Sequence, residues 1–152
     1  MDLLHHDTVD SVAQYALFIL REEFGDAVHI HDRLRYELPA GSTRVVTEVA
    51  GIADHAVILV SAPLALDVPT SPEMFEFVAR QGGRPGLAAM IVIDAGNGRT
   101  DRVNVMVAHH IYGNCLDRAE LLTSVANVAA QADGEDENFV ARFGGKRLAD
   151  AD

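Results

Sequence analysis

The residue types most able to do chemistry in this chain are its histidines and its one cysteine. Four of the seven histidines form the adjacent pairs His5-His6 and His109-His110, and His29 and His31 occupy alternate positions. Alternate residues of a strand share a face, and histidines placed in this way can bind zinc. A zinc site needs three or four converging ligands, however, and no recognised ligand spacing follows. We therefore expect neither a metal nor another cofactor.

Catalytic arrangements are equally hard to assemble from the sequence. Cys115 follows His109 and His110 closely enough to suggest a nucleophile and its base, but a small residue in a loop before a helix explains it more simply. The glycine-rich stretch from Gly82 to Gly86 follows a predicted helix instead of opening one, so it is not a phosphate loop. The acidic residues 133–137 lack the glycine position and the twelfth-position glutamate of a calcium-binding loop, and they predict a solvated helix face. We expect no catalytic residues and no enzyme.

Composition limits the partners. The formal net charge of −11 argues against nucleic acid, because phosphates would be repelled. The apolar run from Ala56 to Ala62 is too short to cross a membrane, which needs about 20 apolar residues. A single cysteine forms no internal disulfide, and the first residues do not resemble a signal peptide, so we expect a cytoplasmic protein.

Three segments have the periodicity of helices. Apolar residues at offsets of three and four predict a helix after Asp7 or Thr8, ending at Gly25. Ser71 and Pro72 predict the start of a short apolar helix that ends at Gly82-Gly83. Asp117 predicts the cap of a long final helix that reaches Gly144, with its continuity at Gly134 left open.

The remaining segments predict strands. These are Val28 to Leu38, Arg44 to Ala50, Ala56 to Ala62 ended by Pro63, Leu87 to Ile93, and a return strand containing Val103, Val105 and Val107. Short turns between successive strands predict antiparallel neighbours. We expect an α+β fold, with an antiparallel five-stranded sheet flanked by helices in the order α-β-β-β-α-β-β-α. Residues 1–145 form one domain in this interpretation, and residues 146–152 form a loose tail.

Several stretches resemble a known family. They are the run from Val57 to Leu64, then Asp67-Val68-Pro69, the helix with Met74, Phe75, Phe77 and Val78, and the closing Ala132-Asp133, Asp136 and Ala141-Arg142-Phe143-Gly144-Gly145. The likeness is to the YbjN-like group, which is often joined to the type III secretion chaperones, and it covers roughly residues 8 to 145. The resemblance implies a helix-flanked antiparallel sheet that dimerises and binds peptide segments of other proteins, without catalytic residues.

The residues themselves also favour binding, because apolar side chains exceed what one subunit needs to bury. Tyr15 and Phe18 lie outside the main apolar stripe of the first helix, and two strands are apolar on both faces. Our first hypothesis is a homodimeric, non-enzymatic module that binds a peptide or protein client, with contacts through Tyr15, Phe18, Val46, Ile58 and Val60. The alternatives are a small-molecule sensor or small enzyme with a histidine-lined pocket (His29, His31, His109 or His110), and a structural subunit of a larger complex.

Overall fold

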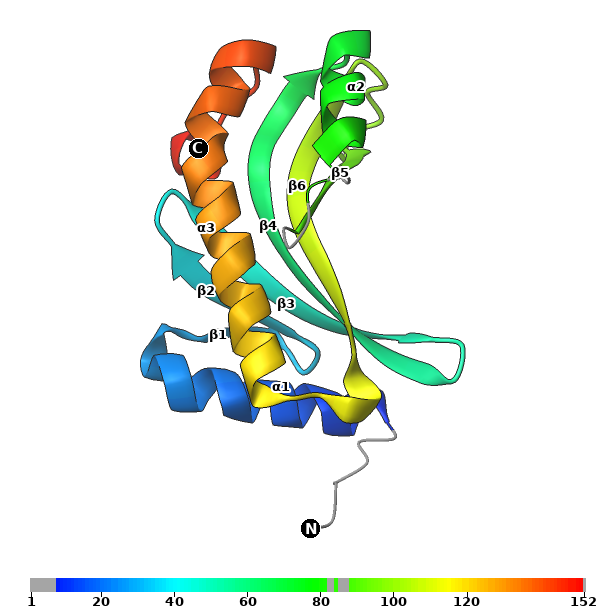
Figure 1. Cartoon of the computed structure of the whole chain (residues 1–152), viewed down its shortest axis with the longest axis vertical. Helices are drawn as coiled ribbons and strands as arrows, with labels where there is room; N and C mark the ends of the chain where they lie inside the picture. The colour runs from blue at the N-terminus through cyan, green and yellow to red at the C-terminus, as the bar shows by residue number, and fades with distance from the viewer. Residues whose placement is uncertain (1–7, 82–83, 85–87, 152) are drawn as a thin grey trace.

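The computed structural model describes residues 8–81, 84 and 88–151. Its α-helices pack against a single β-sheet (Figure 1). The α-helices are α1 (Val9–Phe24), α2 (Pro72–Gln81) and α3 (Arg118–Phe143). The strands are β1 (His29–Asp32), β2 (Arg35–Ala40), β3 (Thr43–Ile52), β4 (His55–Pro69), β5 (Ala89–Asp94) and β6 (Arg102–Tyr112).

All six strands belong to one antiparallel sheet, in the order β1-β2-β3-β4-β6-β5. Hairpins join β1 to β2, β2 to β3, β3 to β4 and β5 to β6, whereas α2 and β5 separate β4 from its neighbour β6 in the sequence. The α+β class and the antiparallel sheet predicted from the sequence are confirmed. The predicted number of strands was one too low.

The additional strand arises because the segment predicted as one strand, Val28 to Leu38, folds back on itself. The Asp32 carboxylate accepts a hydrogen bond from the Leu34 backbone N–H at 2.8 Å. This local bond stabilises a turn, so β1 and β2 pair as a hairpin with Ile30 opposite Tyr36. Asp32, which interrupted the alternating pattern in the sequence, is therefore a turn residue.

Strand β4 continues through Pro63, where we predicted that regular pairing would end. Its pairing with β6 extends to Pro69 through two register shifts, one between Pro63 and Ala65 and one between Ala65 and Val68. A proline cannot donate to the ladder, and an irregular register accommodates that loss. The prediction was wrong because a bulge, not a strand end, follows the proline.

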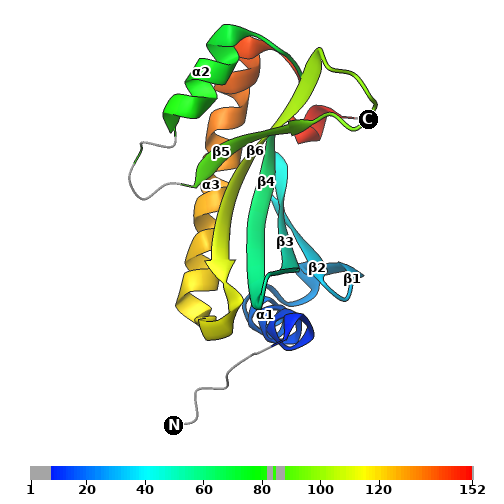
Figure 2. The same ribbon diagram turned by 90° about the vertical axis from the view of Figure 1, so that its right-hand side faces the viewer.

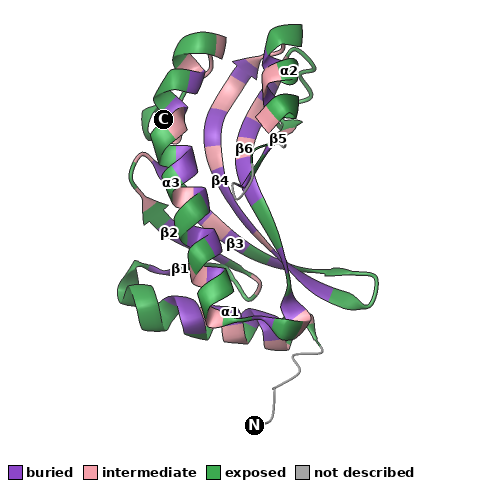
Figure 3. Cartoon of the chain, viewed as in Figure 1, coloured by how far each residue is buried: buried purple, intermediate pink, exposed green. Residues whose placement is uncertain are grey.

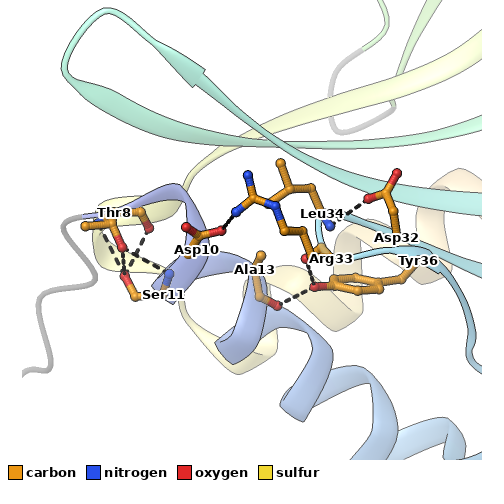
Figure 4. A network of polar contacts seen from close by, with 8 residues as sticks. All are labelled: Thr8, Asp10, Ser11, Ala13, Asp32, Arg33, Leu34 and Tyr36. Carbon is orange, nitrogen blue, oxygen red and sulfur yellow. Dashed lines mark hydrogen bonds and ion pairs between the residues drawn. The ribbon is translucent and has the colours of Figure 1, made fainter.

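The helix starts follow the predicted caps. Thr8 and Ser11 form a capping box at α1, in which the Thr8 hydroxyl accepts from the Ser11 N–H and the Ser11 hydroxyl accepts from the Thr8 N–H (Figure 4). Ser71 and Asp117 cap α2 and α3 through backbone N–H groups. Helix α3 runs unbroken for 26 residues past Gly134. The end predicted for the second helix, Gly82-Gly83, lies outside the described residues.

One face of the sheet packs against α1 and α3; in Figure 2, α3 runs beside β6 and β4, and α1 lies at the end of β4. Tyr36 links α1 to this face, because its hydroxyl lies 3.1 Å from the Ala13 carbonyl oxygen and 2.7 Å from that of Arg33 (Figure 4). Phe77 of α2 packs on α3 against Phe139 and Phe143. Buried positions recur along the helices and strands of this core (Figure 3). The core strand residues on this face include Tyr36, Val45, Val49, Ile58, Val60, Ala62, Met90, Val107 and Ile111.

The segment after α3 is not the loose tail that we expected. Leu66 and Lys146 exchange two backbone hydrogen bonds, of 2.8 and 2.9 Å, and the Ala149 N–H donates to the Ser42 carbonyl oxygen. Arg147 forms ion pairs with Glu137 and Asp150. Residues 146–151 are therefore held against β4 and the turn between β2 and β3.

The acidic residues of α3 were predicted to be solvated, and this was wrong for Asp136, which is 2% exposed. Ser42 contacts two carboxylates here. Its N–H donates to Asp133 at 2.7 Å, and its hydroxyl, which has a single proton to donate, lies between the Asp133 carboxylate at 2.8 Å and the Asp136 carboxylate. The backbone N–H of Ser42, followed by its hydroxyl, lowers the pKa of Asp133. Gly41 is needed beside them, because it has a φ of 59° and any Cβ there would overlap the Asp133 carboxylate.

Candidate functional site

The second face of the sheet has apolar side chains, and none of the described α-helices packs against it. Strand register determines its members, since partners across an antiparallel pair point to the same side: Leu59 faces His110, Ala50 faces Val57, and Met106 faces Ile91. We call this surface the open face. It includes Val46, Leu59, Met106 and Ile91, which are half-buried, and Ile52, Ile93 and Tyr112, which are exposed.

The two edge strands of the sheet differ in how well they are protected. β1 has four residues, a register shift after Ile30, and the polar side chains of His29, His31 and Asp32. These features discourage pairing with another strand. β5 reads Ala-Met-Ile-Val-Ile-Asp, pairs with β6 in an unshifted register, and carries a charge only at its end. Among the described strands, β6 is its only partner. β5 is therefore the edge best able to accept an added strand.

A pocket of about 300 Å³ lies at the end of the open face away from β5, where the β3–β4 hairpin meets the end of β6. We call it the hairpin pocket. Its lining consists of Ile52, Ala53, His55, Val57, His110, Ile111 and Tyr112. The rings of His55 and Tyr112 meet edge to face, with centroids 6.2 Å apart. This volume lies at the lower limit of small-molecule sites, roughly 300–1,000 Å³, and suits a group of side-chain size.

The outer side of α1 is a third apolar surface. Phe18 is 55% exposed and stacks on the half-buried Tyr15, with ring centroids 6.5 Å apart. Leu17 and Phe18 line a shallow groove with Gln14, Arg21 and Glu22. A large exposed aromatic side chain beside charged residues is typical of an association surface.

The five contact residues proposed from the sequence fall in three places. Tyr15 and Phe18 lie together on α1, and Val46 lies on the open face. Ile58 and Val60 have 0% exposure, because their side chains point to the opposite face and pack in the core under the helices. A client or a second subunit cannot reach these two residues in this fold, so we retain only Tyr15, Phe18 and Val46 as contact candidates.

The histidines of β1 lie at a polar site near the edge of the sheet. His29 and His31 border a cavity of about 480 Å³ with Ile30, Glu37, Pro39 and Arg44. Glu37 is largely buried and bonds both His31 and Arg44. Burial raises the pKa of Glu37, but the hydrogen bonds and charges of His31 and Arg44 outweigh it, so the net shift is downward. The group therefore has the character of a structural ion pair, since each oxygen of the Glu37 carboxylate already has a partner.

The other residues considered for chemistry are scattered. His109, His110 and Cys115 are all exposed, and His5 and His6 lie outside the described residues. Within residues 8–81, 84 and 88–151, no group of three or more His, Cys, Asp or Glu side chains is arranged to hold a metal ion. In the same residues, no helix has the length and apolarity needed to cross a bilayer.

Comparison with known proteins identifies the family of the chain. The family model described as T3SS (YopN, CesT) and YbjN peptide-binding chaperone 1 matches residues 10–151, which is nearly the whole chain. None of the curated proteins matches the chain. The resemblance identified from the sequence is confirmed by this match. The chain belongs to the T3SS (YopN, CesT) and YbjN peptide-binding chaperone 1 family.

Proposed function

We propose that this chain is a non-enzymatic module that binds an extended segment of a client protein at β5 and works as a homodimer. Membership of a peptide-binding chaperone family supports the general function. The observation that carries our choice of site is the apolar edge of β5, which pairs only with β6 among the described strands and lies beside the apolar open face.

The chemistry of β5 favours a peptide partner. An edge strand presents backbone N–H and C=O groups that a second extended chain can pair with in register. Side chains of that added strand would alternate between the two sides of the sheet, so every second one would lie near Ile91 and Ile93 on the open face. Backbone pairing supplies affinity that is largely independent of the client sequence. Contacts with the apolar open face favour clients with apolar side chains at alternate positions.

The net charge of −11 favours clients with basic or neutral segments, because an acidic segment would be repelled. We propose that the two copies of the homodimer meet through the outer side of α1, where Phe18 and Leu17 lie beside Arg21 and Glu22. A twofold axis brings the same patch of both copies together, and this patch offers an aromatic centre with charges of both signs at its rim.

The test uses fluorescein-labelled nine-residue peptides of alternating valine and threonine, with lysines at both ends. Fluorescence polarisation measures their binding, and hydrogen exchange locates the amides that they protect. We expect binding with slower exchange in β5. Ile93→Lys should weaken binding about tenfold, because it places a charge beside basic peptides on an apolar surface.

The matched control is Phe75→Lys. Phe75 is 43% exposed on α2 and Ile93 is 42% exposed on β5, so the two variants add the same charge at equally exposed apolar positions. Equal weakening by both variants, or no protection of β5 by any bound peptide, would contradict the proposed site. Failure of the whole panel to bind would contradict the proposed function.

A further inference from the structure

The last four residues of β6 form a second edge of the sheet, separate from β5. β6 pairs with β4 as far as Tyr112, which lies opposite Val57. Its pairing with β5 ends earlier, where Ala108 lies opposite Ala89. Among the described strands, His109 to Tyr112 therefore have a neighbour on one side only. Residues of an antiparallel strand alternate in the neighbour to which they bond, so about half of these residues direct their N–H and C=O groups away from β4.

Side-chain exposure agrees that this edge is accessible. His109, His110 and Tyr112 are exposed, and Tyr112 is 73% exposed. Ile111 is buried, because its side chain lies opposite Ile58 on the helix-covered face. Within the described residues, the segment thus combines a backbone that β4 holds with polar groups that no second strand pairs, which is the condition for accepting an added strand.

The hairpin pocket lies against this same segment. His110, Ile111 and Tyr112 line it from β6, and Ile52, His55 and Val57 complete it from the β3–β4 hairpin. Val57 and Tyr112 are partners across the sheet and point to the open face. A side chain that projects on the open-face side from a strand added to β6 would lie beside His110 and Tyr112, which form the β6 wall of this pocket.

We propose that the hairpin pocket is an anchor site for one leucine or phenylalanine side chain of an extended client segment, whose backbone pairs with His109 to Tyr112. This inference rests on the proposed peptide-binding function and adds a second, selective site to it. The free backbone edge identifies the occupant as a peptide instead of a small metabolite. The pocket selects an apolar side chain because the side chains of Ile52 and Val57 and the rings of His55 and Tyr112 surround it, and its volume holds one side chain.

The test varies one residue of the peptide used above. The probe is Lys-Thr-Val-Thr-X-Thr-Val-Thr-Lys, with X as leucine, phenylalanine, alanine or aspartate. We expect the leucine and phenylalanine peptides to bind about tenfold or more tightly than the aspartate peptide, because only they place apolar surface in the pocket. Hydrogen exchange of the amides of residues 109–112 should slow when they bind.

Variants of the pocket wall make the test specific. Tyr112→Ala removes an exposed wall residue and should weaken binding of the phenylalanine peptide about tenfold while leaving the alanine peptide nearly unchanged. Ile52→Ala, also at an exposed position, should act in the same direction. Both variants should unfold at wild-type denaturant concentrations, because neither residue is in the core.

The outcomes separate this inference from the proposed function. Peptides that bind with equal affinity for every X, or that protect β5 but not residues 109–112, overturn the anchor site and leave peptide binding at β5 standing. Binding of none of the peptides overturns both. Preference for leucine or phenylalanine with protection of residues 109–112, lost in Tyr112→Ala, establishes the anchor.

Discussion

Asp133 and Ser42 are 91 positions apart in the sequence, yet the Asp133 carboxylate accepts both the backbone N–H and the hydroxyl of Ser42. The same hydroxyl reaches the buried Asp136, one turn farther along α3. Two carboxylates of the long helix are thus attached to the turn between β2 and β3, and the Ala149 N–H bonds the Ser42 carbonyl oxygen from the other side.

Ser42→Ala should lower the free energy of unfolding by about 1–3 kcal/mol, because the buried Asp136 carboxylate loses its hydroxyl partner. Urea unfolding measures the change. A double-mutant cycle with Asp136→Asn measures the interaction between the two side chains, and we expect their effects on the free energy of unfolding to be clearly non-additive. Additive effects would show that the Ser42 hydroxyl does not stabilise Asp136.

The lowered pKa of Glu37 predicts that this residue contributes to the loss of folding stability in acid. Its folded-state pKa lies below the ordinary value of about 4.3, so its interactions with His31 and Arg44 stabilise the fold above that pH and are lost as the pH falls through the lowered pKa. Glu37→Gln should therefore be less stable than wild type at pH 6, with the difference shrinking toward pH 3. Chemical unfolding across this range measures it. Glu48→Gln, at an exposed position on the same face, is the control. A difference that stays constant with pH would exclude this role for Glu37.

The raised pKa of Tyr36 predicts a loss of folding stability at high pH. Burial, followed by the charges of Asp32 and Asp10, raises the pKa of its phenol. A raised folded-state pKa means that stability is complete below about pH 10 and is lost as the pH rises beyond it. Tyr36→Phe should cost about 1 kcal/mol at pH 7 and should lose less stability than wild type between pH 9 and pH 11. Tyr112→Phe, at the exposed end of β6, is the control. Equal alkaline loss in wild type and Tyr36→Phe would contradict the assignment.

Phe18→Asp should convert the proposed homodimer to a monomer without unfolding it, because Phe18 is exposed on α1 and an aspartate there places charge in the centre of the interface. Light scattering at micromolar concentration gives the mass, and circular dichroism checks the fold. Phe75→Asp adds the same charge at an exposed phenylalanine of α2 and should remain dimeric. A monomeric wild-type protein under these conditions would remove the dimer from the proposal.

Local signals in the sequence predicted much of the fold. Thr8, Ser71 and Asp117 act on backbone groups within three residues, so their caps are visible in the order of residues. Asp32 also acts locally, because its carboxylate accepts from the Leu34 N–H and stabilises a turn. In the sequence, this turn residue looked like a single interruption in one continuous strand. The choice between the two faces of β4 is not local. Both sets of alternate residues in that strand are apolar, and only the packing of α1 and α3 decides that Ile58 and Val60 are buried while Leu59 lies on the open face.

The candidate site depends even more on distant parts of the chain. The hairpin pocket combines residues 52–57 with residues 110–112, and its existence follows from the pairing of β4 with β6 across the intervening α2 and β5. Sequence spacing contains no signal for that pairing. The apolar character of β5 was visible, but its place at the edge of the sheet follows only from the strand order.

β6 connects both proposed contact regions and therefore fixes their separation. Tyr112 borders the hairpin pocket, and Asn104 lies opposite Ile93 near the far end of β5. Eight residues separate these positions (112 − 104 = 8), which at a rise of about 3.3 Å per residue is roughly 26 Å. A client that occupies both ends must span that length, so segments shorter than about eight extended residues can engage one end at a time, and the strand acts as a molecular ruler for the proteins it selects.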